Sequence, residues 1–277
     1  MRVALQALDG NALAVQRWGQ GPAIVALHGF TGTSATWEPL AETLGPGYEL
    51  VGIDIIGHGE SDAPGDVGLY TMARFVSALS ELLDRLGLER VCWLGYSMGA
   101  RIALRAALDL PERTWGLVLE SGTPGLPSET ERAERVAADE ALAQRIEAEG
   151  IERFVDYWET LPLWAGDWRI SDAQRQRLRE SRLAQRPLGL ANSLRGMGTG
   201  AQEPLHDRLG EIRVPALIMA GEEDTKFRDI AGDVAKAITV SRLVVVPEAG
   251  HAVHLEQPER FTELVTEFLD SVPADGC

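Results

Sequence analysis

The sequence is poor in cysteine and contains no long uninterrupted apolar run. Its two cysteines are Cys92, inside an apolar strand-like stretch, and Cys277, the last residue, so they exclude a disulfide framework and match no metal-ligand spacing. No apolar stretch approaches the ~20 residues that span a bilayer, and the first ten residues lack the basic-then-apolar order of a signal peptide. We therefore expect a cytoplasmic protein with no metal site and no membrane contact.

Basic residues are also scarce relative to acidic ones. The 277 residues include 26 Lys and Arg against 42 Asp and Glu, which gives a net charge of −16. This charge opposes binding to nucleic acid or anionic lipid, so an anionic ligand must find a local basic pocket. Hydrophobic residues make up 45% and charged residues 25%, as in soluble globular proteins, which excludes disordered, collagen-like and coiled-coil chains.

Strand-like and helix-like patterns alternate along most of the chain. We expect strands over residues 3–8, 13–18, 23–27, 49–54, 91–95, 115–120, 216–221 and 242–247. We expect helices over residues 36–44, 71–86, 98–110, 227–238 and 258–269. The alternation predicts an α/β fold with a mostly parallel sheet and helices on both faces. A Gly10-Asn11 turn joins the first two strands, and with the third they predict a three-stranded antiparallel start.

The pattern changes between about residues 125 and 209. This stretch has no β-branched run, is charged and helical, and contains three tryptophans, Trp158, Trp164 and Trp168. We interpret it as a helical cap inserted in the fold. The predicted organisation is an α/β core of residues 1–121 and 209–277 with a cap of residues 122–208.

A G-x-S-x-G motif, Gly95-Tyr96-Ser97-Met98-Gly99, follows an apolar strand and opens an amphipathic helix. In this context the glycines let the chain turn sharply and hold a serine hydroxyl above the carboxyl edge of the sheet. The alternative is a chance match in a tight strand-to-helix turn. We favour Ser97 as a catalytic serine because the partners that it needs follow in the sequence.

A catalytic serine needs a histidine to take its proton, and that histidine needs a carboxylate to fix its tautomer. Asp224 follows one predicted strand and His251 follows the last, in the order Ser, Asp, His. Glu222 and Glu223 are alternatives for the acid, but they lie in the turn itself, so we favour Asp224. We expect His254 to pack against the closing helix or to lie at the surface.

Several motifs together resemble those of the α/β-hydrolase superfamily across nearly the whole chain. They are residues 28–32 followed by Trp37, the loop at 54–61, residues 95–99, Asp224 and His251. The resemblance implies an α/β-hydrolase fold in which two backbone N–H groups form an oxyanion hole. Those groups belong by position to Phe30 and Met98, although residues 28–32 could also be an ordinary glycine-rich loop.

Finer features resemble one branch, the 2-succinyl-6-hydroxy-2,4-cyclohexadiene-1-carboxylate synthases of menaquinone biosynthesis. They are the strings at 96–101, at the start of the cap (124–126 and 131–135), at its end (197–202) and at 221–227. The sequence departs from the family pattern at Ala100, where glycine is common, and at Ile56, where proline is usual. Neither departure removes a catalytic group.

This branch implies a cofactor-free lyase acting on a small polyanionic substrate. The substrate carries a succinyl, a ring and an enolpyruvyl carboxylate, and abstraction of a proton leads to elimination of pyruvate. Positive charge in the cap agrees with such a ligand, although we expect most of these arginines to form a solvated helix face. Between residues 169 and 195 the predicted cap holds seven arginines: Arg169, Arg175, Arg177, Arg179, Arg182, Arg186 and Arg195.

Arg101 lies four residues after Ser97, on the same face and in the first turn of the predicted helix. The helix dipole disfavours a cation there by ~0.3–1 kcal/mol, so its presence points to a bound anion. A guanidinium fork suits a carboxylate, although a salt bridge to the cap is the alternative role. The resemblance adds five substrate-binding residues: Tyr96, Arg135, Trp158, Arg182 and Lys226.

Two other functions stay open. The same triad cleaves esters or the C–C bonds of ring-cleavage products, and the fold alone does not choose between these reactions. Arg101 and the cap strings argue against a plain esterase, whose pocket would be mostly apolar. A non-catalytic hydrolase-like receptor usually has a damaged triad, whereas this triad is complete. The sequence carries no signal of the oligomeric state.

Overall fold

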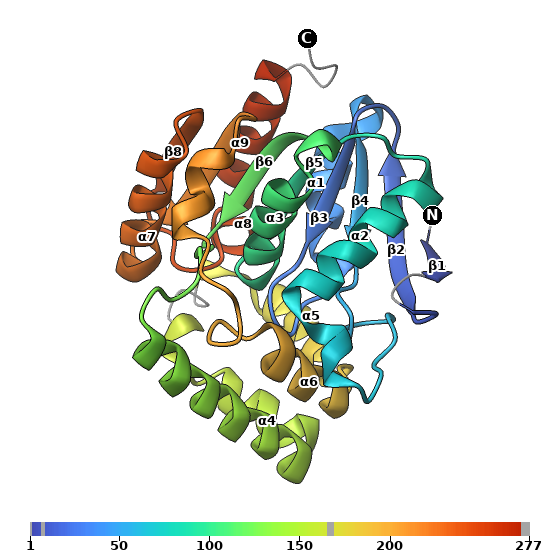
Figure 1. Ribbon diagram of the computed structural model, residues 1–277, viewed down its shortest axis with the longest axis vertical. Helices are drawn as coiled ribbons and strands as arrows, with labels where there is room; N and C mark the ends of the chain where they lie inside the picture. The colour runs from blue at the N-terminus through green and yellow to red at the C-terminus, as the bar shows by residue number, and fades with distance from the viewer. Residues whose placement is uncertain (1, 7–8, 165–168, 273–277) are drawn as a thin grey trace.

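A computed structural model describes residues 2–6, 9–164 and 169–272. Trp168 and Cys277, noted above, lie outside these ranges. One eight-stranded sheet in the order β1-β2-β4-β3-β5-β6-β7-β8 runs through the molecule (Figure 1). The strands are β1 (Arg2–Gln6), β2 (Ala12–Gly19), β3 (Ala23–Leu27), β4 (Glu49–Ile53), β5 (Val91–Tyr96), β6 (Thr114–Glu120), β7 (Ala216–Gly221) and β8 (Ser241–Val246).

The predicted three-stranded antiparallel start is wrong. Strand β1 pairs antiparallel with β2, but β2 then pairs antiparallel with β4, while β3 lies between β4 and β5 and is parallel to both. The reason is the burial of β3, whose five residues are all buried and apolar. A strand that is apolar on both faces suits the centre of a parallel sheet covered by helices better than an exposed meander.

Helices cover both faces of the sheet, as the sequence predicted. On one face lie α2 (Met72–Leu86), α3 (Met98–Asp109) and α7 (Thr225–Ala237), which share one apolar core with the sheet. On the other lie α1 (Glu38–Leu44), α8 (Val253–Glu256) and α9 (Pro258–Ser271), which share a second core. In α2 the buried Phe75, Leu79 and Leu82 follow helical spacing, so one stripe of the helix faces the sheet. No described helix has the length and apolar character needed to span a membrane.

Between β6 and β7 the described chain contains helices and no strand. They are α4 (Glu129–Trp158), interrupted at Gly150, α5 (Asp172–Leu183) and α6 (Pro187–Met197), and they gather at one end of the sheet, low in Figure 1. They enclose a third apolar cluster that includes Ile146, Phe154 and Leu190. The two ends of the segment meet, because the Leu205 N–H donates to the Pro124 carbonyl at 2.8 Å.

Short 3₁₀ helices complete the described chain. They are η1 (Ser34–Trp37), η2 (Gly45–Gly47), η3 (Val67–Tyr70), η4 (Pro111–Arg113), η5 (Pro162–Trp164) and η7 (His206–Glu211). The predicted helix at 36–44 is therefore a 3₁₀ turn followed by α1.

Candidate active site

Ser97 occupies a strained turn between β5 and α3. Its backbone has φ 51° and ψ −107°, a conformation that non-glycine residues rarely adopt. The flanking glycines make the turn possible: a Cβ on Gly95 would lie 2.2 Å from the Gly99 carbonyl oxygen, and one on Gly99 would lie 2.0 Å from that of Leu27. The Ser97 N–H is fixed by the Glu120 carbonyl at 2.8 Å. The turn therefore presents the hydroxyl at the end of the strand.

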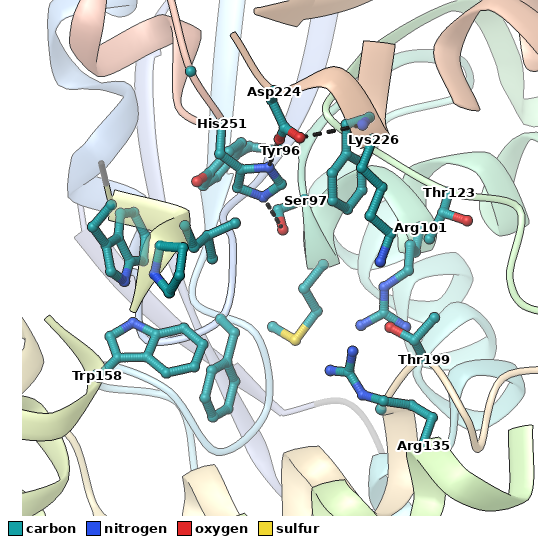
Figure 2. Close-up of a pocket in the computed structure, with 18 of the residues that line it drawn as sticks. Tyr96, Ser97, Arg101, Thr123, Arg135, Trp158, Thr199, Asp224, Lys226 and His251 are labelled. Atoms are coloured by element: carbon teal, nitrogen blue, oxygen red, sulfur yellow. Dashed lines mark hydrogen bonds and ion pairs between the residues drawn. The ribbon is translucent and has the colours of Figure 1, made fainter. Parts of the chain in front are cut away.

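The side chains of Ser97, His251 and Asp224 form one continuous chain of contacts (Figure 2). His251 Nε2 lies 3.0 Å from Ser97 Oγ, and His251 Nδ1 lies 2.6 Å from Asp224 Oδ2. Asp224 is also the N-cap of α7, since its Oδ1 accepts the Phe227 N–H at 3.2 Å. A neutral imidazole whose Nδ1–H donates to the carboxylate can accept the serine proton at Nε2.

Of the three acidic residues considered for the triad, Asp224 is the one in contact with the imidazole. Glu223 instead forms an ion pair with Arg169, and the Glu222 side chain is exposed. Arg169 also binds Glu256 at 3.1 Å.

Glu256 and Phe227 support His251 and were not identified from the sequence. Glu256 accepts the N–H groups on both sides of the histidine, from Gly250 at 2.9 Å and from Ala252 at 3.3 Å. The Phe227 ring lies edge-on to the imidazole, with 4.6 Å between ring centroids. Phe227 lies in the 221–227 string, whereas Glu256 has no local motif that marks its role.

Phe30 and Met98 line the same cavity as Ser97. Met98 is the first residue of α3, so its N–H has no acceptor within the helix. The loop before Phe30 is held by His28, whose Nδ1 lies 2.8 Å from the Gly29 carbonyl and whose Nε2 accepts the Ile55 N–H at 3.0 Å. Burial lowers the pKa of His28, which agrees with this neutral tautomer.

A cavity of about 500 Å³ opens above Ser97 between the sheet and the helices that follow β6. Phe30, Trp158 and Trp164 are among its apolar lining residues, and Phe30 and Trp158 contact edge-on with ring centroids 5.4 Å apart. Arg101, Arg135 and Lys226 also line the cavity, and Figure 2 places these cations together on one side of it, across from Trp158. A ligand with carboxylates on one side and a carbon ring on the other would match both walls.

Arg101 is almost fully buried, with 7% of its surface exposed. Its Nη1 donates to the Met197 carbonyl at 2.8 Å and to Gln202 Oε1 at 2.9 Å. Burial, and secondly the charge of Arg135, lower the pKa of Arg101 to about 10. The cation is thus held without a directly bonded carboxylate among the described residues, which suits it to bind an anion.

Four of the five residues added by the resemblance line the cavity: Tyr96, Arg135, Trp158 and Lys226. The Tyr96 hydroxyl is buried without a hydrogen-bond partner among the described residues, and burial raises its pKa well above the usual value. Arg182 is placed differently. It is not among the lining residues, and its guanidinium binds Glu159 at 3.0 Å and lies 4.4 Å from the ring centroid of Trp164. Arg182 therefore packs against Trp164, a lining residue, without lining the cavity itself.

The seven arginines of residues 169–195 do not form a positive pocket. None of the seven lines the cavity. Acidic side chains pair with five of them. Arg179 binds Asp156 and Glu159, and Arg195 binds Glu140 and Glu147 at 2.8 and 2.6 Å. The positive charge at the cavity comes instead from Arg101, Arg135 and Lys226.

Comparisons with known proteins identify the family of the chain. A sequence profile for the alpha/beta hydrolase fold matches residues 22–258. A Bacillus subtilis (strain 168) protein, provisionally named 2-succinyl-6-hydroxy-2,4-cyclohexadiene-1-carboxylate synthase, is 47% identical over 95% of this chain and 97% of its own. The Serratia proteamaculans (strain 568) protein of that name is 30% identical over 90% of this chain and 93% of its own.

A solved structure is also similar. MenH from S. aureus superposes with a TM-score of 0.89 and 34% identity, covering 92% of this chain and 97% of that one. The α/β-hydrolase fold that was predicted from the sequence is confirmed. The chain therefore belongs to the α/β-hydrolase family, in the branch of the 2-succinyl-6-hydroxy-2,4-cyclohexadiene-1-carboxylate synthases.

Proposed function

We propose that this protein eliminates pyruvate from 2-succinyl-5-enolpyruvyl-6-hydroxy-3-cyclohexene-1-carboxylate, giving 2-succinyl-6-hydroxy-2,4-cyclohexadiene-1-carboxylate in menaquinone biosynthesis. The observation that carries the proposal is the position of Ser97: its hydroxyl contacts His251 and lies in the same cavity as Arg101 and Arg135. A basic oxygen beside two cations suits proton abstraction from a substrate with several carboxylates.

In the proposed reaction the triad acts as a base. His251 accepts the Ser97 proton, and the serine oxygen takes the ring proton of the substrate or relays it to the imidazole. The electron pair of the broken C2–H bond forms a C2–C3 double bond, the C3–C4 double bond shifts to C4–C5, and the bond from C5 to the enolpyruvyl oxygen breaks. The enolate that leaves takes up a proton on its methylene carbon and becomes pyruvate. Asp224 stabilises the imidazolium. The serine needs no covalent bond to the substrate, and the reaction needs no cofactor.

Phe30 and Met98 would supply the oxyanion hole. Proton abstraction beside a carbonyl places negative charge on its oxygen, and two backbone N–H groups fixed in advance stabilise that charge. Arg101 and Arg135 would bind substrate carboxylates, with Lys226 as a third cation. Tyr96 and Trp158 would contact the ring and its substituents.

We further infer that residues 122–208 act as a cap over a core of residues 1–121 and 209–277. The helices α4 to α6 have their own apolar cluster and supply Arg135 and Trp158 to the cavity. A cap of this kind would keep water away from the reacting carbon and add the residues that recognise the substrate.

The alternative is a hydrolase that cleaves an ester or a C–C bond of a carboxylated substrate. A serine in contact with a histidine, together with an oxyanion hole, also catalyses acyl transfer. One experiment separates the two functions. Purified protein is incubated with the enolpyruvyl substrate while pyruvate is followed by a coupled assay, in parallel with a fluorogenic ester. Pyruvate release with slow ester cleavage is expected, and rapid ester cleavage without pyruvate would overturn the proposal.

A further inference from the structure

We infer that Asp139, a buried carboxylate beside the cavity, is a positioning residue that holds the Arg135 guanidinium toward the substrate and so helps to select carboxylate-bearing ligands. The inference rests on the proposed function, because that function gives Arg135 a substrate carboxylate to bind.

Arg135 and Asp139 lie one turn apart on α4, and Arg135 Nε donates to Asp139 Oδ1 at 2.8 Å. The Asp139 side chain is 6% exposed, whereas that of Arg135, which lines the cavity, is 45% exposed. Because Nε is held by the carboxylate, the two Nη groups form the outer end of the side chain. Figure 2 shows the Arg135 guanidinium directed into the cavity toward that of Arg101.

Two guanidinium groups that face one cavity repel each other when no anion lies between them. The charge of Arg135 helps to lower the pKa of Arg101, whereas that of Asp139 acts in the opposite direction. Without the bond to Asp139, a long exposed side chain would gain rotamer freedom and turn toward solvent. Asp139 therefore keeps Arg135 in place before the substrate arrives.

Asp139 occupies an unfavourable position for a carboxylate. Burial raises its pKa, although Arg135 and Arg101 act against the shift, and its Oδ2 has no hydrogen-bond partner among the described residues. A buried polar atom without a partner costs free energy. Asp139 does not line the cavity, so its placement is explained by what it does to Arg135.

Two glycines in the 197–202 string make room for this arrangement. A Cβ on Gly198 would lie 2.4 Å from Asp139 Oδ2, and a Cβ on Gly200 would lie 3.0 Å from the Cβ of Arg135. The loop that follows α6 therefore packs directly against the turn of α4 that carries both residues. The glycines of the 197–202 string are therefore needed for the loop to pack against Arg135 and Asp139.

The test compares Asp139→Ala with Asp139→Asn by steady-state pyruvate release. Alanine frees Arg135, so the substrate must order that side chain itself, and KM is expected to rise about 3- to 10-fold while kcat changes less than about 2-fold. Asparagine keeps an oxygen that accepts the Nε–H, so its KM is expected to stay within about 2-fold of the original value. In the Arg135→Ala background, Asp139→Ala is expected to add no further rise in KM.

Glu140→Ala is the matched control, since Glu140 lies on the same helix and binds Arg195, which does not line the cavity. Its KM is expected to be unchanged. If Arg135→Ala raises KM but Asp139→Ala does not, or if asparagine raises KM as much as alanine, the positioning role is wrong and the proposed function stands. If Arg135→Ala leaves KM unchanged, the assignment of Arg135 to the substrate fails, and the inference fails with it.

Discussion

The Asp224 carboxylate lies 2.6 Å from Nδ1 of His251, on the side of the imidazole away from Ser97. The other carboxylate oxygen accepts the N–H of Phe227, so the first turn of α7 fixes the orientation of the acid. The loop that carries His251 is fixed separately, because Glu256 accepts the N–H groups of Gly250 and Ala252. The relative position of acid and base therefore depends on β7 and β8, which are adjacent and parallel.

Substitution of Asp224 should lower turnover far more than substrate affinity. Asp224→Asn removes the charge that stabilises the imidazolium, and kcat is expected to fall by about 10⁴-fold. Glu223→Gln is the control, since Glu223 binds Arg169 and not the imidazole. Steady-state kinetics of both variants check this, and equal losses in kcat would show that the acid has been assigned wrongly.

Removal of the serine or the histidine should abolish turnover and leave the fold intact. We expect Ser97→Ala and His251→Ala each to lower kcat by about 10⁴-fold or more, because triad members act as a unit. For the same reason the double variant should be little worse than either single one. Pyruvate release and thermal unfolding measure the two effects, and substantial activity in Ser97→Ala would contradict the role of the serine.

Arg101→Ala should weaken the reaction of the anionic substrate selectively. Loss of a charge-assisted pair worth ~1.5–3 kcal/mol corresponds to about 10- to 150-fold in kcat/KM. Arg101→Lys keeps the charge but loses the guanidinium fork, whose Nη1 donates to Met197 and Gln202, so it should also be impaired. A neutral ester serves as the control substrate. Equal losses on both substrates would mean that Arg101 only connects α3 to the end of α6.

Stability should fall in mild acid because of two buried histidines. Burial lowers the pKa of His28, and burial and the charge of His28 lower that of His58 from 6.5 to about 3. Below pH 6.5 the unfolded chain binds protons that the folded protein excludes, so stability present above this pH is lost as the pH falls. Between pH 6.5 and about 3 the free energy of unfolding falls by up to about 1.4 kcal/mol per pH unit through His58, and His28 acts in the same direction.

Urea unfolding at pH 7.5 and 5.5 measures this loss. His58→Gln should reduce the slope of the unfolding free energy against pH by the part that His58 contributes. Because the substitution alters packing at every pH, the slope of the unfolding free energy against pH is the quantity to compare. An unchanged slope in the variant would exclude His58 as a source of the acid sensitivity.

The contact between the three side chains of the candidate triad could be predicted because their signals are local. Ser97, Asp224 and His251 each follow an apolar strand, and parallel strands bring their carboxyl ends to one edge of the sheet. The position of β3 could not be predicted in the same way. A short connection after β2 favours a hairpin locally, but the order of the strands depends on pairing with β4, which is distant in the sequence.

The segment between β6 and β7 was harder to interpret for a related reason. The arginines of residues 169–195 are visible as a cluster, but several of the acids that neutralise them lie in α4, such as Glu147 and Asp156. A count of charges within a window misses partners from another helix. Asp139 was overlooked for the same reason, since its effect depends on the loop at Gly198 as well as on Arg135.

The hydrogen bond between Leu205 and Pro124 closes the segment between β6 and β7 into a loop whose ends meet. The segment therefore leaves the sheet after β6 and returns toward β7 from nearly the same place. Changes in its length or helix content need not alter the spacing of β6 and β7, because closing a longer loop costs little additional entropy. This geometry allows relatives to exchange the whole segment, and with it Arg135 and Trp158 in the wall of the cavity, while the strand ends next to Ser97 and Asp224 stay in place.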